Sequence, residues 1–173
     1  DTGSGSVRAR DVAGSLNVDT GSGGVDVLRA RGPVRVDTGS GSVRLREIRG
    51  DRVLVDTGSG GVVGSAIEAD ELEVDTGSGS IELREVTATD VLLDTGSGSV
   101  EIALTRSGSV TVRAPESLGA EVEIETGSGG IDVEFPLRMR TARRDLVIGT
   151  IGDGQGQITI DTGSGGVRLL QGS

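Results

Sequence analysis

The amino-acid sequence predicts an all-β, single-domain β-solenoid, and two observations carry this prediction. The first is a motif, Asp-Thr-Gly-Ser-Gly-Ser/Gly followed by a β-branched residue, that returns at intervals of 18 or 19 residues over the first hundred positions. Such a period is typical of units that bury their apolar side only against their neighbours. The second is the alternation of apolar and polar residues between motifs, which indicates half-buried strands. The motif begins at Asp1, Asp19, Asp37, Asp56, Asp75, Asp94, Glu125 and Asp161.

The regular coils span residues 1–104 and share one arrangement. Each consists of a strand, a corner, a second strand and the Gly-Ser-Gly turn. In the first coil, Val7 and Ala9 alternate with Arg8 and Arg10. Glycine is favoured in the turn because it reaches backbone conformations that strain other residues.

The irregular coils span residues 105–173 of the same domain (1–173). The segment 105–110 is a degraded motif that arrives after half a period, and the Gly-rich segment 152–156 replaces another motif. Counting the half-coil, the sequence predicts about nine coils of 18–19 residues. Neither end shows a capping unit, so we expect open strand edges that favour self-association through the end coils.

Composition and charge argue against several functions. The net charge is −10, with +2 over residues 1–55, −14 over 56–134 and +2 over 135–173. An acidic middle disfavours nucleic-acid binding. No apolar run is long enough to span a membrane, and no signal peptide is present in this chain. The chain has no His, Cys, Lys or Tyr, so the common catalytic bases and nucleophiles are missing. We expect a protein that is not an enzyme and has no cofactor.

The motif aspartates form the main candidate site. Stacked coils would place Asp19, Asp37, Asp56, Asp75 and Asp94 in one column at about 4.8 Å spacing, where neighbouring charges repel. Either the Gly-Ser-Gly turn offsets the repulsion with backbone N–H donors, or Ca²⁺ bridges the coils. An aspartic-protease dyad needs two lobes or chains, which a ladder of turns does not supply. The motif threonines could form an ice-binding face, or ladders of hydroxyls that bond one another.

The second candidate region is an Arg-rich insertion. It contains the only Phe, the only Met and four of the 17 arginines. It either covers the solenoid locally, with arginine stems lying along the surface, or binds a partner such as a membrane surface or an acidic polymer. The partner-binding candidates are Phe135, Arg138, Met139, Arg140, Arg143 and Arg144.

The repeated motif, the tract from Val112 to Gly130 and the segment 148–154 resemble the bacterial "putative adhesin" β-repeat family, which is related to toast-rack domains. The resemblance covers essentially the whole chain. It implies a single-stranded, right-handed β-helix in an extracytoplasmic protein of the cell envelope or surface, and no catalytic residues.

Together these features favour a non-catalytic structural or interaction module, a rigid rod that stacks head to tail into filaments. The alternative is a Ca²⁺-dependent surface adhesin that binds a glycan or another envelope polymer.

Overall fold

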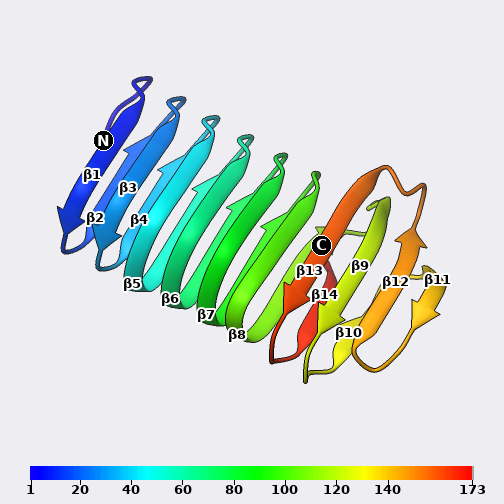
Figure 1. Ribbon diagram of the computed structural model, residues 1–173. Helices are drawn as coiled ribbons and strands as arrows, with labels where there is room; N and C mark the ends of the chain where they lie inside the picture. The colour runs from blue at the N-terminus through cyan, green and yellow to red at the C-terminus, as the bar shows by residue number, and fades with distance from the viewer. Residues whose placement is uncertain (173) are drawn as a thin grey trace.

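The structure, a computed structural model, describes residues 1–172, without the side chains of residues 104–107 and 172. Every regular element in this range is a strand, and the strands form one sheet that coils into a rod (Figure 1). The described residues include no helix that could cross a membrane. The strands are β1 (Val7–Ala13), β2 (Leu16–Thr20), β3 (Val25–Arg31), β4 (Val34–Thr38), β5 (Val43–Thr57), β6 (Val62–Thr76), β7 (Ile81–Thr95), β8 (Val100–Pro115), β9 (Ala120–Thr126), β10 (Ile131–Val133), β11 (Leu137–Ala142), β12 (Leu146–Ile151), β13 (Gly156–Thr162) and β14 (Val167–Gly172).

The regular part confirms the predicted all-β, single-domain β-solenoid. Five turns stack in chain order: β1–β2, β3–β4, β5, β6 and β7. All their pairings are parallel, and equivalent residues of successive motif repeats are register partners. In the view of Figure 1 the motif turns form the row of small loops at the upper end of these coils. The 18- or 19-residue period is therefore one complete turn of the solenoid.

A left-handed residue bends each regular coil at the same place. Asp11, Arg29, Glu47, Ala66 and Glu85 have φ between 53° and 58°, and none is glycine. The pairing register skips each of them, so the strand turns a corner there instead of continuing straight. This conformation costs an L-residue about 1–2 kcal/mol, and the ladder bonds on both sides of the corner hold it in place.

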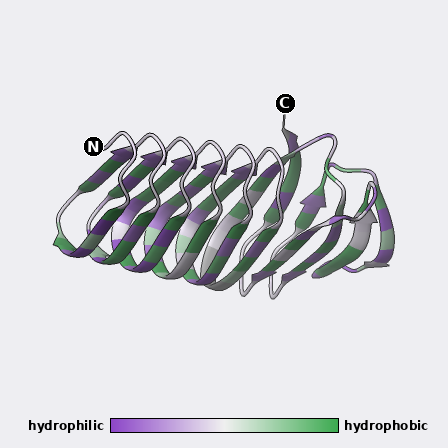
Figure 2. Ribbon diagram, turned by 90° about the horizontal axis from the view of Figure 1, so that it is seen from above, coloured by the Kyte–Doolittle hydropathy of each residue, from purple (hydrophilic) through white to green (hydrophobic). Residues whose placement is uncertain are grey.

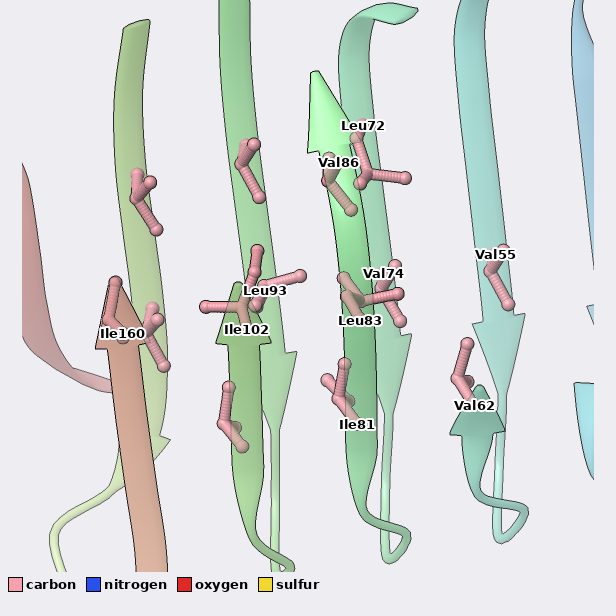
Figure 3. Close-up of a cluster of buried hydrophobic side chains, with 14 of the residues drawn as sticks. Val55, Val62, Leu72, Val74, Ile81, Leu83, Val86, Leu93, Ile102 and Ile160 are labelled. Carbon is pink, nitrogen blue, oxygen red and sulfur yellow. The ribbon is translucent and has the colours of Figure 1, made fainter. Parts of the chain in front are cut away.

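The core is a column of small aliphatic side chains inside the coils. Inward positions such as Val55, Leu72 and Leu93 are 0% exposed. Figure 2 shows the alternation of hydrophobic and hydrophilic residues along the strands, and Figure 3 shows valine, leucine and isoleucine side chains filling the interior. Burial of these side chains is the main stabilising contribution to a solenoid of this composition.

The chain does not continue as nine successive coils. After β8, the next coil in space is formed by β13 and β14, and the coil beyond it by β9 and β10. β12 is likewise inserted between β9 and β11, with antiparallel pairing on both sides. Each motif sequence predicts its own turn, but it does not specify which coil will lie beside it. The count of about nine coils is thus replaced by about five regular turns followed by an interlaced region.

The predicted half-coil has a clear structural counterpart at residues 105–110. Gly108 packs against the carbonyl of Thr89, and Gly165 packs against that of Gly108, at the corner end of the coils. The turns at 127–130 and 163–166 therefore lie at the opposite end of the coils from the first motif turns (Figure 1). The side chains of Thr105 and Ser107, which suggested the degraded motif, lie outside the described part.

The Arg-rich insertion forms a cap, which corrects the expectation that neither end carries one. β11 and β12 make an antiparallel hairpin that extends the sheet beyond β9. Phe135 is only 5% exposed and belongs to the core cluster, together with Val147 and Ile151. This residue and the hairpin close the interior on that side. At the other end of the described sheet, β1 pairs on one side only, with β3.

Candidate functional site

The motif turns are joined to one another by buried threonines. Thr57 is 0% exposed; its Oγ1 accepts a hydrogen bond from the Gly60 N–H (3.1 Å) and donates to the Gly41 carbonyl of the preceding coil (3.3 Å). The buried motif threonines are Thr20, Thr38, Thr57, Thr76, Thr95, Thr126 and Thr162. Oγ1 of Thr20, Thr38, Thr76, Thr95 and Thr126 likewise donates to a glycine carbonyl of another coil.

This arrangement corrects both interpretations of the threonine column, the ice-binding face and the ladder of hydroxyls. The side chains point inward and bond the backbone of neighbouring turns, so they form neither an exposed hydroxyl face nor a ladder of hydroxyls that bond one another. Burying a hydroxyl without a partner is costly, and among the described residues every buried side-chain N or O atom has a hydrogen-bond partner. The motif is therefore a structural device that joins successive coils.

The aspartates immediately before these threonines form the predicted column. Their positions are register partners from coil to coil. Because neighbouring strands of a sheet lie about 4.8 Å apart, successive aspartates of the column have that spacing along the rod. The column comprises Asp19, Asp37, Asp56, Asp75 and Asp94. In β8 the partner of Asp94 is Arg113, so the run of like charges ends at an arginine. Arg35 also approaches Asp37, at 3.7 Å.

Burial, and then the charges of neighbouring aspartates, raise the pKa of two carboxyls in the column. Burial is the largest cause for Asp56, followed by the charges of Asp37 and Asp75, while Arg35 acts in the opposite direction. The pKa of Asp75 is raised by burial and by the charge of Asp94. Because the folded state binds these protons more tightly, the stability from protonation is present below the unfolded pKa and is lost as pH rises through the folded pKa. At neutral pH both carboxylates oppose folding.

The column is not a closed metal cage. Among the described residues, no group of three or more His, Cys, Asp or Glu side chains is placed to surround a metal ion. Any cation at this site would bridge aspartates of adjacent coils and would keep most of its coordinated water molecules. Ca²⁺ binding therefore remains a prediction that rests on the shared register of the candidate residues, which are Asp19, Asp37, Asp56, Asp75 and Asp94.

The arginine insertion divides into a buried and an exposed part. Burial removes Phe135 from the surface, so the interpretation of this residue as a partner contact is replaced by a core role. Met139 is 62% exposed on β11. Arg138, Arg140, Arg143 and Arg144 are exposed as well. Arg140 forms an ion pair with Glu121, whose carboxylate also accepts a hydrogen bond from Thr150 at 2.8 Å. These four arginines and Met139 remain candidates for a partner surface.

A set of ion pairs between coils was not predicted from the sequence. Arg29 bonds Asp11 at 2.5 Å, Arg46 bonds Asp26 at 2.9 Å, and Arg84 bonds Glu101 at 3.2 Å. The hydrogen bond from Arg29 is the largest cause of a lowered pKa at Asp11. The sequence does contain a sign of these pairs, because the oppositely charged partners lie about one period apart. It can be recognised only after successive coils have been aligned at their corner residues. Exposed pairs of this kind contribute little stability, so they mainly shape the charge pattern of the surface.

Comparisons with known proteins identify a family for this chain. The chain is similar to the solved structure of a putative cell adhesion protein from Clostridium sporogenes, with 13% sequence identity, coverage of 98% of this chain and 93% of that chain, and a TM-score of 0.33. None of the curated proteins compared with the chain matches it. The family model described as Toastrack DUF4097 matches residues 7–170, which is nearly the whole sequence. The chain therefore belongs to the Toastrack DUF4097 family.

Proposed function

We propose that this chain is a non-catalytic structural and interaction module of the bacterial cell envelope, built as a rigid rod. The observation that carries the proposal is the continuous ladder of backbone and threonine hydrogen bonds between coils. Such a ladder supplies stiffness along the rod and leaves the outer residues free to vary. The hydroxyls of the motif threonines are buried in that ladder, and the sequence contains no His, Cys, Lys or Tyr. The envelope location rests on the family resemblance.

Head-to-tail stacking into filaments is the finer part of the proposal. It is supported by the two outermost strands, β1 and β11, since each has strand partners on one side only in the described sheet and the β11–β12 hairpin therefore still presents an open edge. The N–H of Val7 donates to the carbonyl of Gly24 in the next coil. Alternate residues of a parallel strand bond the same neighbour, so the N–H and C=O of Arg8, the residue after Val7, face the open edge. Arginines lie at both ends, on β1 and on β11, and like charges oppose their approach. We expect stacking to increase with ionic strength, because salt screens this repulsion.

Negative-stain electron microscopy over a range of protein and salt concentrations tests this expectation. We expect rods that join into uniform filaments as both concentrations rise. Arg8→Pro should abolish filaments, since it removes an N–H that faces the open edge and leaves the pairing with β3 intact. Arg8→Ser, which removes only the charge, should retain them. Isolated rods under every condition would contradict the stacking model and leave a single rod as the functional unit.

The second candidate function is that of a Ca²⁺-dependent surface adhesin for a glycan or another polymer. The in-register aspartate column, with raised pKa values at Asp56 and Asp75, favours it, because a divalent cation would relieve the repulsion. Without Ca²⁺, Asp75→Asn should raise the melting temperature at pH 7 by about 2–4 °C, which corresponds to about 1 kcal/mol of relieved repulsion. Asp70→Asn, which removes a charge outside the column, is the matched control.

Addition of Ca²⁺ separates the two candidates. If Ca²⁺ bridges the column, millimolar CaCl₂ should raise the melting temperature of the wild type more than MgCl₂ does, and Asp75→Asn should reduce that gain. An equal response of the wild type and both variants would remove the adhesin candidate. The structural proposal would be unaffected by that result.

A further inference from the structure

The structure contains a coil that lies out of chain order, and we infer that copies of this protein can exchange it. Residues 156–172 form β13 and β14 and fill a slot between coils that precede them in the sequence. On one side lies β8, and on the other lie β9 and β10. In Figure 1 this coil, drawn in red and orange, lies between green and yellow strands. The partner implied by the slot is the same coil of a second copy of this chain.

The slot is fully formed on both sides of the inserted coil. β13 pairs in parallel with both β8 and β9, and β14 pairs in parallel with both β8 and β10. Ile158, Ile160, Val167 and Leu169 are each no more than 1% exposed. An empty slot would therefore expose two facing rows of unpaired backbone groups and an apolar interior. Such edges readily pair with another chain, and an identical coil fits them in the same register.

A short hinge joins this coil to the rest of the molecule. Residues 152–155 lead from β12 across the edge of β9 into β13. Gly152 and Gly154 have φ values of 55° and 72°, and Gly154 donates its N–H to the Ile151 carbonyl at 3.1 Å. This tight, left-handed turn is required only while the coil returns to its own molecule. An extended hinge can carry the coil to a neighbouring molecule, and hinge loops under strain favour such swaps.

The order of synthesis makes the exchange accessible. Residues 1–151 contain β8, β9 and β10, which form both walls of the slot, and they are made before the coil that fills it. The walls belong to strands whose connection, residues 116–119, spans the level of the missing coil. Pairing between strands that are far apart in the sequence forms slowly. During this interval a coil from another molecule competes for the same slot, whereas the regular coils from β1 to β7 pair with their sequence neighbours and have no such gap.

Single-cysteine variants of the full chain test the exchange, since the wild type has no cysteine. Thr111 on β8 and Arg168 on β14 are register partners, and adjacent strands at about 4.8 Å lie within disulfide range. Thr111→Cys and Arg168→Cys proteins are mixed, unfolded, refolded together under oxidising conditions and analysed by mass spectrometry. A disulfide between the two different variants requires β14 of one copy to lie beside β8 of another.

The matched control pairs Leu92→Cys with Thr111→Cys, which are register partners on the sequence neighbours β7 and β8. We expect the yield of the disulfide-linked heterodimer of the Thr111→Cys and Arg168→Cys proteins to be at least several-fold higher than that of the control heterodimer. The test heterodimer should be rare when the two variants are folded separately before mixing. Gly154→Ala in both chains should increase it further, because alanine disfavours the left-handed hinge. Equal yields from the test and control pairs, with the Thr111→Cys/Arg168→Cys double variant closing only within one chain, would overturn the proposal.

Discussion

Replacement of Gly60 by alanine is expected to lower the melting temperature by about 6–12 °C. A Cβ at Gly60 would overlap the carbonyl oxygen of Gly41 in the preceding coil. That carbonyl also accepts the hydrogen bond of Thr57, so it cannot move away without breaking the ladder. Overpacking costs about 1–3 kcal/mol and occasionally more. Because the overlapping atom belongs to rigid backbone, we expect a loss of about 3 kcal/mol here, and for a domain of this size each kcal/mol corresponds to about 2–4 °C.

The adjacent glycine provides the control for this prediction. A Cβ at Gly61 would lie 3.4 Å from the Ser80 carbonyl oxygen, which is an ordinary contact. Other motif copies carry serine at the equivalent position, for example Ser42 and Ser80. Gly61→Ala should therefore melt within about 2 °C of the wild type, which corresponds to less than about 0.5 kcal/mol. Similar losses for both substitutions would show that close approach of the coils is not the cause.

The second large effect is expected at Thr57, whose hydroxyl joins two coils. Thr57→Val retains the shape of the side chain but leaves the Gly60 N–H and the Gly41 carbonyl without this partner. Each buried group that loses its hydrogen bond costs about 1–3 kcal/mol, so we expect a loss of about 2–4 kcal/mol in the free energy of unfolding. Urea denaturation followed by circular dichroism measures this loss from the transition midpoint.

Two further substitutions separate hydrogen bonding from other causes. Thr57→Ser retains the hydroxyl and should recover most of the lost stability. Thr87→Val, at a position in β7 that is not fully buried, should have little effect. If Thr57→Val were as stable as Thr57→Ser, backbone pairing and apolar burial alone would hold the coils together, and the threonine ladder would be incidental.

The regular coils could be predicted from the sequence because each repeat carries its own local instructions. Inward valines and leucines alternate with outward polar residues, and the motif specifies a turn, so residues 1–104 follow directly. The corner at Asp11 and its equivalents was not predictable in this way. No glycine marks it, and its left-handed backbone is imposed by the ladders on either side. Tertiary contacts, rather than the preference of the residue, decide that conformation.

The interlaced region could not be predicted from local pattern. The segments that form β9 and β13 both alternate in the same way, so either sequence could pair with β8. The choice depends on contacts between residues more than fifty positions apart, such as Ile158 with Val100. The aspartate column was predicted correctly as a column, because it depends only on the period. The sequence left two roles open for Phe135, a local cover of the solenoid or a partner contact, since an aromatic residue among arginines gives no sign of whether it points inward.

The direction of the hydrogen bonds between coils has a mechanical consequence. These bonds run along the rod axis, so an axial pull on the regular coils acts on one coil boundary at a time and peels coils away singly. Each released coil of 18 or 19 residues yields about 60 Å of extended chain. The interlaced coils from β8 to β14 cannot be peeled in chain order, because the coil beside β8 is held by β9 and β10 as well. Under load the regular coils from β1 to β7 would thus unfold and extend one at a time, while the interlaced region from β8 to β14 would resist unfolding.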